Sequence, residues 1–478
     1  MLPGISPEQR SISVGSPLLS SRRGGSSPAR AWLVLSCLAM LQFLIAVDVT
    51  VVNVALPSIG QDLGADARRL TWVVVGYTIT GGGLLMLGGR LGDVFGRRRV
   101  LLAGTVLFGA ASLLAGLAPS FSLLVAARLV QGAGEALALP AAMAVIVLMF
   151  PEGPRRSRAL GVWAAVASSG LVLGFVLSGV VTQLLGWRWI FLVAVPFIVF
   201  VLAATILLVP ADPPGRGARL DPRGSVLLTA APLLFALGVV EAGKDGGLGP
   251  LSPVALAGAA LAGTLFVVTE RRTADPLIPP GFFRNRARVL ANLATALLSA
   301  ALSTSFLLFT YHLQNRLGLS PLAAGLTLLP LAVSLIAAAT FVPRLLGRWG
   351  ARVCAVTGIV LTALGMVAIA AAPAGAHALA TVPAMVLIAA GMGFGIVGLQ
   401  YAAVTGVTGD DAGAAAGVQR AADQLGGSTG ITVYIGVGFA PAFAGIDPFV
   451  TSSALALAGL AAAGFIAWRI ILPAPAKG

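Results

Sequence analysis

Long apolar stretches recur through this chain, and they constrain its fold more than any other feature of the sequence. The first begins at Ala31 and the last ends near residue 472. Each is close to the roughly 20 residues that an α-helix needs to cross the hydrocarbon core of a bilayer. Only 10% of the 478 residues are charged, against about 25% in an average soluble domain. We therefore predict an all-α polytopic membrane protein.

The apolar runs that lie between charged or Gly/Pro-rich loops predict fourteen transmembrane helices. Their expected ranges are 31–56, 70–91, 100–118, 122–149, 159–183, 189–209, 224–240, 251–269, 289–311, 322–343, 353–373, 378–401, 414–440 and 450–472. Residues 1–30, rich in Ser, Gly, Pro and Arg, are expected to form a disordered cytoplasmic tail. Residues 473–478 are expected to form a second, short cytoplasmic tail.

Basic residues alternate between the two sides of this topology. With the N-terminus inside, only five of the 31 basic residues fall in external loops: Arg68, Arg69, Arg188, Lys244 and Arg316. This asymmetry follows the positive-inside rule, and an even number of spans places both termini in the cytoplasm. The basic residues that give the net charge of +14 therefore lie mostly in short loops, and this placement predicts no nucleic-acid surface. The Ala, Gly and Arg excess suggests a bacterium, so we expect the plasma membrane.

Residues 90–119 align with residues 344–373 at a constant offset, which indicates an internal duplication. The matched positions include Gly96 with Gly350, as well as Arg and Pro residues that apolar composition alone does not explain. Parallel repeats are typical of transporters, whose binding site lies between the repeats near the bilayer midplane. The predicted units are a six-helix bundle at 31–209, a linker at 210–288 with two extra helices and a cytoplasmic loop, and a six-helix bundle at 289–472.

The loop after the second expected helix concentrates glycine and charge. It runs Gly89-Arg-Leu-Gly-Asp93-Val-Phe-Gly96-Arg97-Arg98-Arg. Glycine permits a tight turn, and one carboxylate among arginines can form an ion pair that breaks and re-forms. The spacing resembles the cytoplasmic motif of the major facilitator superfamily. The resemblance implies a conformational switch loop whose aspartate contacts the start of helix 13 near Ala412; the alternative is that these arginines only satisfy the positive-inside rule.

Charged residues also fall inside the helix expected at 122–149. Arg128 followed by Gln131 and Gly132 resembles the fourth-helix motif of the same superfamily. A buried arginine is costly in lipid and should face the protein interior beside a partner. Glu135 lies two turns further on and shares its face. Proton-linked chemistry is one interpretation, and a permanent ion pair that only positions helices is the other.

Asp48 lies within the first expected helix, in Val47-Asp48-Val-Thr-Val-Val-Asn53. This stretch resembles the first-helix motif of the fourteen-helix drug:proton antiporters. At 1.5 Å per residue, Asp48 and Arg128 each lie on the order of 10 Å from the external ends of their helices, so they could meet. Burial favours the neutral acid and pairing favours the carboxylate, so such a group can take up and release a proton. A fixed salt bridge is the alternative.

Two further helices carry patterns that match this family. The fifth has Gly170, Gly174 and Gly179 on a small-residue face that allows close helix packing. It resembles the antiporter motif but departs from it, because Phe175 replaces the usual proline. The thirteenth has a polar group in a small, apolar stretch: Gln419, Arg420, Asp423 and Gln424. This group indicates a functional site, unless the helix begins several residues later than expected.

The resemblance extends from the first helix to the thirteenth and implies a proton-coupled exporter of amphipathic drugs or secondary metabolites that works by alternating access. We assign proton coupling to Asp48, Arg128, Glu135 and Asp423, and the substrate cavity to Asn53, Gln131, Arg420 and Gln424. No enzyme, metal or cofactor motif is present, and the proton gradient is the expected energy source. We expect a monomer that interacts with the lipid bilayer, protons and a small amphipathic substrate. A symporter or uniporter of a polar metabolite is the alternative.

Overall fold

The computed structural model describes residues 28–150, 153–210, 221–242, 249–273, 276–278, 282, 284–371, 377–405, 412–440 and 445–470. Every regular element within these ranges is a helix. Residues 28–30, expected in the N-terminal tail, already belong to the first helix. The rest of that tail and the tail expected at 473–478 lie outside the described residues.

Long helices build the first half of the chain. They are α1 (Pro28–Leu63), α2 (Ala67–Phe95), α3 (Arg97–Gly116), α4 (Phe121–Met149), α5 (Pro154–Leu185), α6 (Trp189–Leu192) and α7 (Ala194–Leu208). Local chemistry sets several of their ends. Asp66 and Ser120 cap α2 and α4 by accepting hydrogen bonds from backbone N–H groups of the first turn. Gly96 separates α2 from α3 with φ 94°, a conformation that favours glycine.

The second half begins with a hairpin and continues with a second set of long helices. The elements are α8 (Pro222–Glu241), α9 (Leu251–Arg272), α11 (Arg286–Tyr311), η2 (His312–Arg316), α12 (Pro321–Thr327), α13 (Leu329–Ala371), η3 (Ala378–Thr381), α14 (Val382–Val404), α15 (Ala412–Gly430), η4 (Ile431–Ile435), α16 (Gly436–Gly438) and α17 (Pro448–Trp468). The helices expected at 322–343 and 353–373 fall mainly within α13, which breaks at Gly350 with φ 77°. The helix expected at 289–311 continues through a π-helical turn to Arg316.

Twelve of the described helical stretches are long and apolar enough to cross a membrane. Two long helices are not among them. α5 contributes only the shorter apolar stretch Leu173–Leu185, and α15 carries the polar group predicted from the sequence. The described chain is therefore an all-helical protein with many membrane spans.

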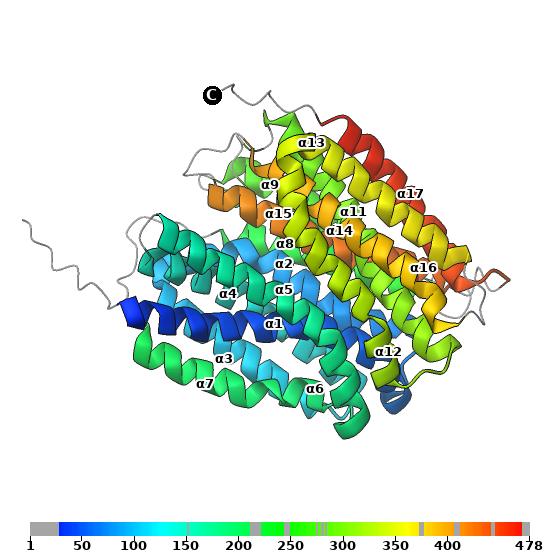
Figure 1. The fold of residues 1–478 in the computed structure, drawn as a ribbon, viewed down its shortest axis with the longest axis horizontal. Helices are drawn as coiled ribbons and strands as arrows, with labels where there is room; N and C mark the ends of the chain where they lie inside the picture. Colours follow the sequence, from blue (N-terminus) through cyan, green and yellow to red (C-terminus); the bar gives the residue numbers. More distant parts are fainter. Residues whose placement is uncertain are drawn as a thin grey trace, which may run out of the picture.

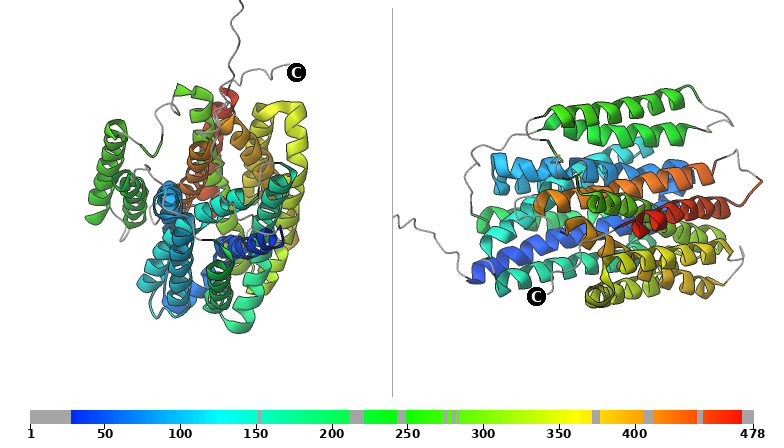
Figure 2. Two further views of the ribbon diagram at one scale, coloured as in Figure 1. Left: turned by 90° about the vertical axis from the view of Figure 1, so that its left-hand side faces the viewer. Right: turned by 90° about the horizontal axis from the view of Figure 1, so that it is seen from above.

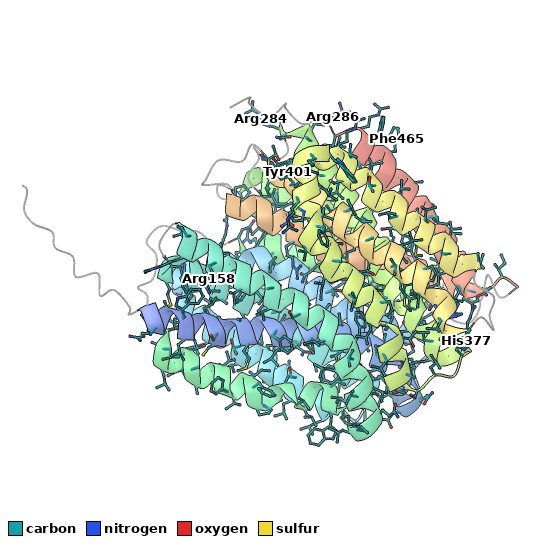
Figure 3. The ribbon with its side chains drawn as sticks, in the orientation of Figure 1. Arg158, Arg284, Arg286, His377, Tyr401 and Phe465 are labelled. Carbon is teal, nitrogen blue, oxygen red and sulfur yellow. The ribbon has the colours of Figure 1, made fainter. Side chains whose placement is uncertain are left out.

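The two halves lie side by side with their helices running between the same two ends (Figure 1). The largest buried apolar cluster crosses between them and includes Leu56 and Val73 of the first half and Leu308 and Ile435 of the second. Two helix pairs make the main contacts between the halves, α2 with α15 and α5 with α12. Arg158 and Arg284 lie toward one end of the molecule and His377 toward the other (Figure 3).

The hairpin of α8 and α9 is central in the sequence but peripheral in space. Figure 2 shows it as a pair at one side of the molecule. α8 packs on α2, whereas α9 packs mainly on α8. Arg68, expected in an external loop, is instead buried in the first turn of α2 and donates to the carbonyls of Val240, at 2.7 Å, and Ala242. It thereby fastens the C-terminal end of α8 to α2.

Candidate functional site

A buried ion pair lies between α1 and α4. The Arg128 guanidinium donates through Nη1 to Oδ2 of Asp48 at 2.5 Å, and the two residues are 1% and 6% exposed. Gln131 donates to the other carboxylate oxygen at 2.9 Å and accepts from Arg128 at 2.8 Å. Both carboxylate oxygens are therefore hydrogen-bonded, as a buried ion pair requires. The structure brings together three residues singled out from the sequence.

Groups outside the predicted set complete this network. Arg128 Nε donates to the Val73 carbonyl at 2.8 Å, and its guanidinium carbon stands 4.1 Å from the centre of the Tyr77 ring. Ser112 accepts from the Gln131 amide at 3.0 Å. Sequence reasoning missed Tyr77 and Ser112 because neither is charged and both lie in expected spans. The one sequence feature that could have indicated them is a polar side chain within a span that neighbours the helix of Arg128.

Close packing of α4 explains why these charges are inaccessible. A Cβ built on Gly132 would stand 2.2 Å from the Tyr77 carbonyl, and one built on Gly134 would stand 2.6 Å from the Phe108 nitrogen. Glycine at these two positions therefore lets α2 and α3 approach α4 from both sides. The resulting packing excludes solvent from Arg128.

Glu135 lies elsewhere, at the contact between the two halves. It is fully buried, and its Oε1 accepts from the Gln424 amide of α15 at 3.1 Å. Its Oε2 has no hydrogen-bond partner in the described part of the chain. Although Glu135 and Arg128 share a helix, their hydrogen bonds run to different neighbours. An ionised carboxylate without a paired cation is costly in such a place.

The other polar residues of α15 form a separate group against α11. Ser299 donates to the Asp423 carboxylate at 2.6 Å, and Arg420 lies 3.5 Å from the same side chain. The Arg420 side chain is 51% exposed. Gln419 donates to Thr295 at 3.0 Å. Asp423 is thus distinct from the Asp48–Arg128 pair.

Asn53, assigned to the substrate cavity, donates to the Val49 carbonyl of its own helix at 3.1 Å. The helix-5 glycines contact two different partners. A Cβ on Gly170 would stand 2.7 Å from Ala46 of α1, and one on Gly174 would stand 1.9 Å from Thr50 of α1. One on Gly179 would stand 2.6 Å from the Pro321 carbonyl of α12, across the contact between halves.

The expected switch loop is largely helical: Gly89 and Asp93 lie in the last turns of α2, Arg97 and Arg98 begin α3, and Gly96 alone separates the two helices. Asp93 pairs with Arg97 at 3.0 Å, and Arg98 donates to the Ile206 carbonyl of α7 at 2.6 Å. A Cβ built on Gly89 would stand 3.7 Å from Cβ of Pro140 on α4, an ordinary van der Waals distance. The partner expected for Asp93 near Ala412 borders residues 406–411, which lie outside the described residues.

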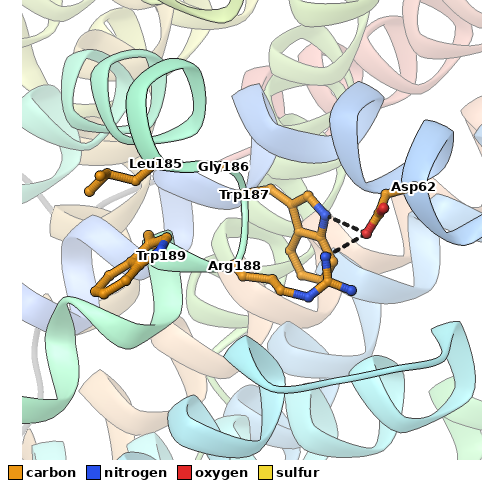
Figure 4. A pocket seen from close by; sticks show the side chains of 6 residues that line it. All are labelled: Asp62, Leu185, Gly186, Trp187, Arg188 and Trp189. Carbon is orange, nitrogen blue, oxygen red and sulfur yellow. Dashed lines mark hydrogen bonds and ion pairs between the residues drawn. The ribbon is translucent and has the colours of Figure 1, made fainter.

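A small pocket opens at the Gly186 turn between α5 and α6 (Figure 4). It measures about 310 Å³ and is lined by Asp62, Leu185, Gly186, Trp187, Arg188 and Trp189. Asp62 accepts from the Trp187 indole at 3.0 Å and from Arg188 at 2.6 Å. Its charged groups already pair with one another, and none belongs to the buried network. In the described ranges no group of three or more His, Cys, Asp or Glu side chains could hold a metal.

Known proteins share both the sequence and the fold. The Major Facilitator Superfamily profile matches residues 38–431. The lincomycin resistance protein of Streptomyces lincolnensis is 53% identical over 434 residues, 90% of each chain. The cephamycin export protein CmcT of Amycolatopsis lactamdurans is 40% identical over 423 residues, 87% of each chain. The solved POT family transporter PepTSo superposes with a TM-score of 0.68 over 92% of this chain and 98% of its own, at 14% identity.

Proposed function

Because this chain belongs to the major facilitator superfamily, we propose that it is a proton-coupled antiporter of the fourteen-helix drug:proton branch. It is an efflux transporter and not an enzyme, in line with relatives named for antibiotic resistance and export. Its substrate class is amphipathic antibiotics or related secondary metabolites. Inward proton movement supplies about 2.3 kcal/mol per charge per 100 mV, which can drive export.

The observation that carries proton coupling is the presence of ionisable side chains inside membrane-spanning helices. Asp48 is held by Arg128, and Glu135 keeps one oxygen without a partner among the described residues. Intramembrane charges of this kind are costly and typically serve transport. In our proposal Asp48 and Glu135 carry protons, and Asp423 is a further carrier. Arg128 changes the proton affinity of Asp48 as the two groups pair or separate.

The fourteen-span architecture is part of the same proposal. It counts α5 and α15 as spans in addition to the twelve apolar stretches. The repeat is supported by Gly96 and Gly350, which have positive φ values of 94° and 77° at matching positions. It is also supported by Gly104 and Gly358, which pack closely against α4 and α14, respectively. The monomer would lie in the bacterial plasma membrane with both termini cytoplasmic.

Alternating access assigns roles to the remaining residues. The switch loop contains Gly89, Asp93, Gly96, Arg97 and Arg98. Its ion pairs would break and re-form as the two halves rotate relative to each other. The contacts of α2 with α15 and of α5 with α12 would open in turn. The substrate would bind between the halves near Arg420 and Gln424. Asn53 on α1 and Gln131 on α4 would contribute to that site from the first half. Each is held in place by a hydrogen bond within that half.

The test is substrate-triggered proton release from acidified everted vesicles, with lincomycin and a cephamycin as first substrates. We expect wild-type protein to release protons on substrate addition, and Asp48→Asn and Glu135→Gln to release few or none. Asp62→Asn is the matched control, since Asp62 is exposed and, among the described residues, pairs with Trp187 and Arg188. Release that both buried variants preserve would refute the assignment of the carriers.

A further inference from the structure

Two buried oxygen atoms lie near the same point of the contact between the halves. Glu135 Oε2 on α4 and Gln424 Oε1 on α15 both lack a hydrogen-bond partner among the described residues. A Cβ built on Gly81 of α2 would stand 3.3 Å from the first oxygen and 3.5 Å from the second. Both oxygens therefore converge on the same point beside α2.

The remaining atoms of the two groups are already bonded. Gln424 Nε2 donates to Glu135 Oε1 at 3.1 Å. A carboxylic acid and a primary amide can form two hydrogen bonds, because the amide N–H donates to one acid oxygen and the acid O–H donates to the amide oxygen. One of these bonds is present here. The second requires a proton on Glu135.

This conclusion does not depend on the orientation of the Gln424 amide. If its oxygen and nitrogen are exchanged, the amide oxygen stands 3.1 Å from Glu135 Oε1, where two acceptors then meet. In either orientation the amide oxygen lacks a donor while Glu135 is ionised. The carboxylate and amide oxygens are both acceptors in that state, so a single proton resolves the conflict.

None of the neighbouring charged or titratable groups satisfies both oxygens in place of that proton. Asp48 and Arg128 pair with each other. Arg420 pairs with Asp423 and is half exposed. The buried Tyr77 hydroxyl of α2 lies close to the Glu135 carboxyl group, although it makes no hydrogen bond of normal geometry in the described ranges. Donation from Tyr77 to Glu135 would still leave the Gln424 oxygen without a donor.

We propose that Glu135 is protonated in this conformation and forms a doubly hydrogen-bonded acid–amide pair with Gln424, so that proton binding holds α4 of the first half against α15 of the second. The inference rests on the proposed antiport and adds a positioning role for Gln424 to its proposed place near the substrate. Loss of the proton to solvent leaves a carboxylate oxygen against an amide oxygen. The two halves then separate along this contact.

A neighbouring contact provides an internal comparison. Thr78 of α2 and Ser428 of α15 share a hydrogen bond of 2.6 Å between hydroxyl groups. This bond also joins the halves but contains no titratable group. Its removal should weaken the contact without changing how the contact responds to pH.

Two measurements on the full-length protein test the proposal. Isotope-edited infrared spectroscopy should detect a protonated carboxyl band at neutral pH that Glu135→Gln removes and that Asp62→Asn leaves in place. Spin labels on exposed helix positions, Leu148→Cys and Tyr401→Cys in a background without Cys37 and Cys354, should report the distance between the halves.

The variants have distinct expected outcomes. Wild-type distances should lengthen as pH rises, and Glu135→Gln should stay short at all pH values because two amides pair in the same way. Gln424→Leu should lose the pH response, whereas Ser428→Ala should keep the wild-type midpoint. An unchanged midpoint in Gln424→Leu, or no carboxyl band assigned to Glu135, would overturn the proposal. Neither result would affect substrate-triggered proton release, which tests the antiport itself.

Discussion

Replacing Asp48 by asparagine isolates the energetic role of the buried ion pair. The asparagine side chain keeps an oxygen for the Gln131 amide but presents an NH₂ group to Arg128 in place of the carboxylate oxygen at 2.5 Å. Arg128, 1% exposed, then keeps its bonds to Val73 and Gln131 but has lost its counter-charge. Removing one partner of a buried pair costs about 3–5 kcal/mol. We expect a loss of about 3 kcal/mol, roughly 100-fold in the unfolding equilibrium.

The assay is reversible unfolding in mixed micelles, followed by fluorescence of the seven tryptophans. Adding Arg128→Met should recover most of the lost stability, since the double variant leaves no unpaired charge. Asp62→Asn is the control: its partner Arg188 and Asp62 itself are 39% and 46% exposed, so we expect a change of about 0–1 kcal/mol. The reasoning fails if Asp48→Asn is as mild as the control, or if the double variant is less stable than Asp48→Asn.

Three further substitutions test packing and backbone geometry. Gly174→Val should prevent close approach of α1 and α5, because the new Cβ would stand 1.9 Å from the Thr50 hydroxyl, and folded yield after detergent extraction should fall sharply. Gly96→Ala should cost about 1–3 kcal/mol in thermal stability and slow transport, since its φ of 94° is strained for alanine. Arg68→Gln should lower stability by about 1.5–3 kcal/mol in the same melts, since the charged donor that holds the end of α8 is lost.

Matched variants accompany these three changes. Gly263→Val and Gly161→Ala place a side chain where nothing lies within 4 Å, so neither should change yield or melting. Arg69→Gln alters the neighbouring arginine, which lies over the Phe121 ring rather than on α8. Equal effects in a variant and its control would mean that the stated contact is not the cause.

The sequence predicts the helices and the family well, because both depend on local patterns. Apolar runs of membrane-spanning length place most helices within a few residues of their observed ranges. The profile match over residues 38–431 confirms the superfamily expected from the loop and helix motifs. Helix ends are less accurate. The π-helical extension from His312 to Arg316, for example, has no simple hydropathy signal.

Partners across helices were harder to predict, because a one-dimensional pattern does not fix how neighbouring helices rotate. The depth of Asp48 and Arg128 could be estimated from the helical rise, and the two residues do meet. Glu135 could not be paired in this way, since its partner Gln424 lies 289 residues further along the chain. Arg68 was expected in an external loop, yet it lies in the first turn of α2 and binds the last carbonyls of α8, a contact that requires knowing where the hairpin packs.

The peripheral position of α8 and α9 has a mechanical consequence. α9 is attached to the protein chiefly through α8, and α8 in turn rests on α2. A change in bilayer thickness that tilts α9 would act on α8 and then on α2, the helix that leads into the Gly96 turn. The hairpin would thus transmit a change in the surrounding lipid to α2, and this would alter how readily the transporter changes conformation.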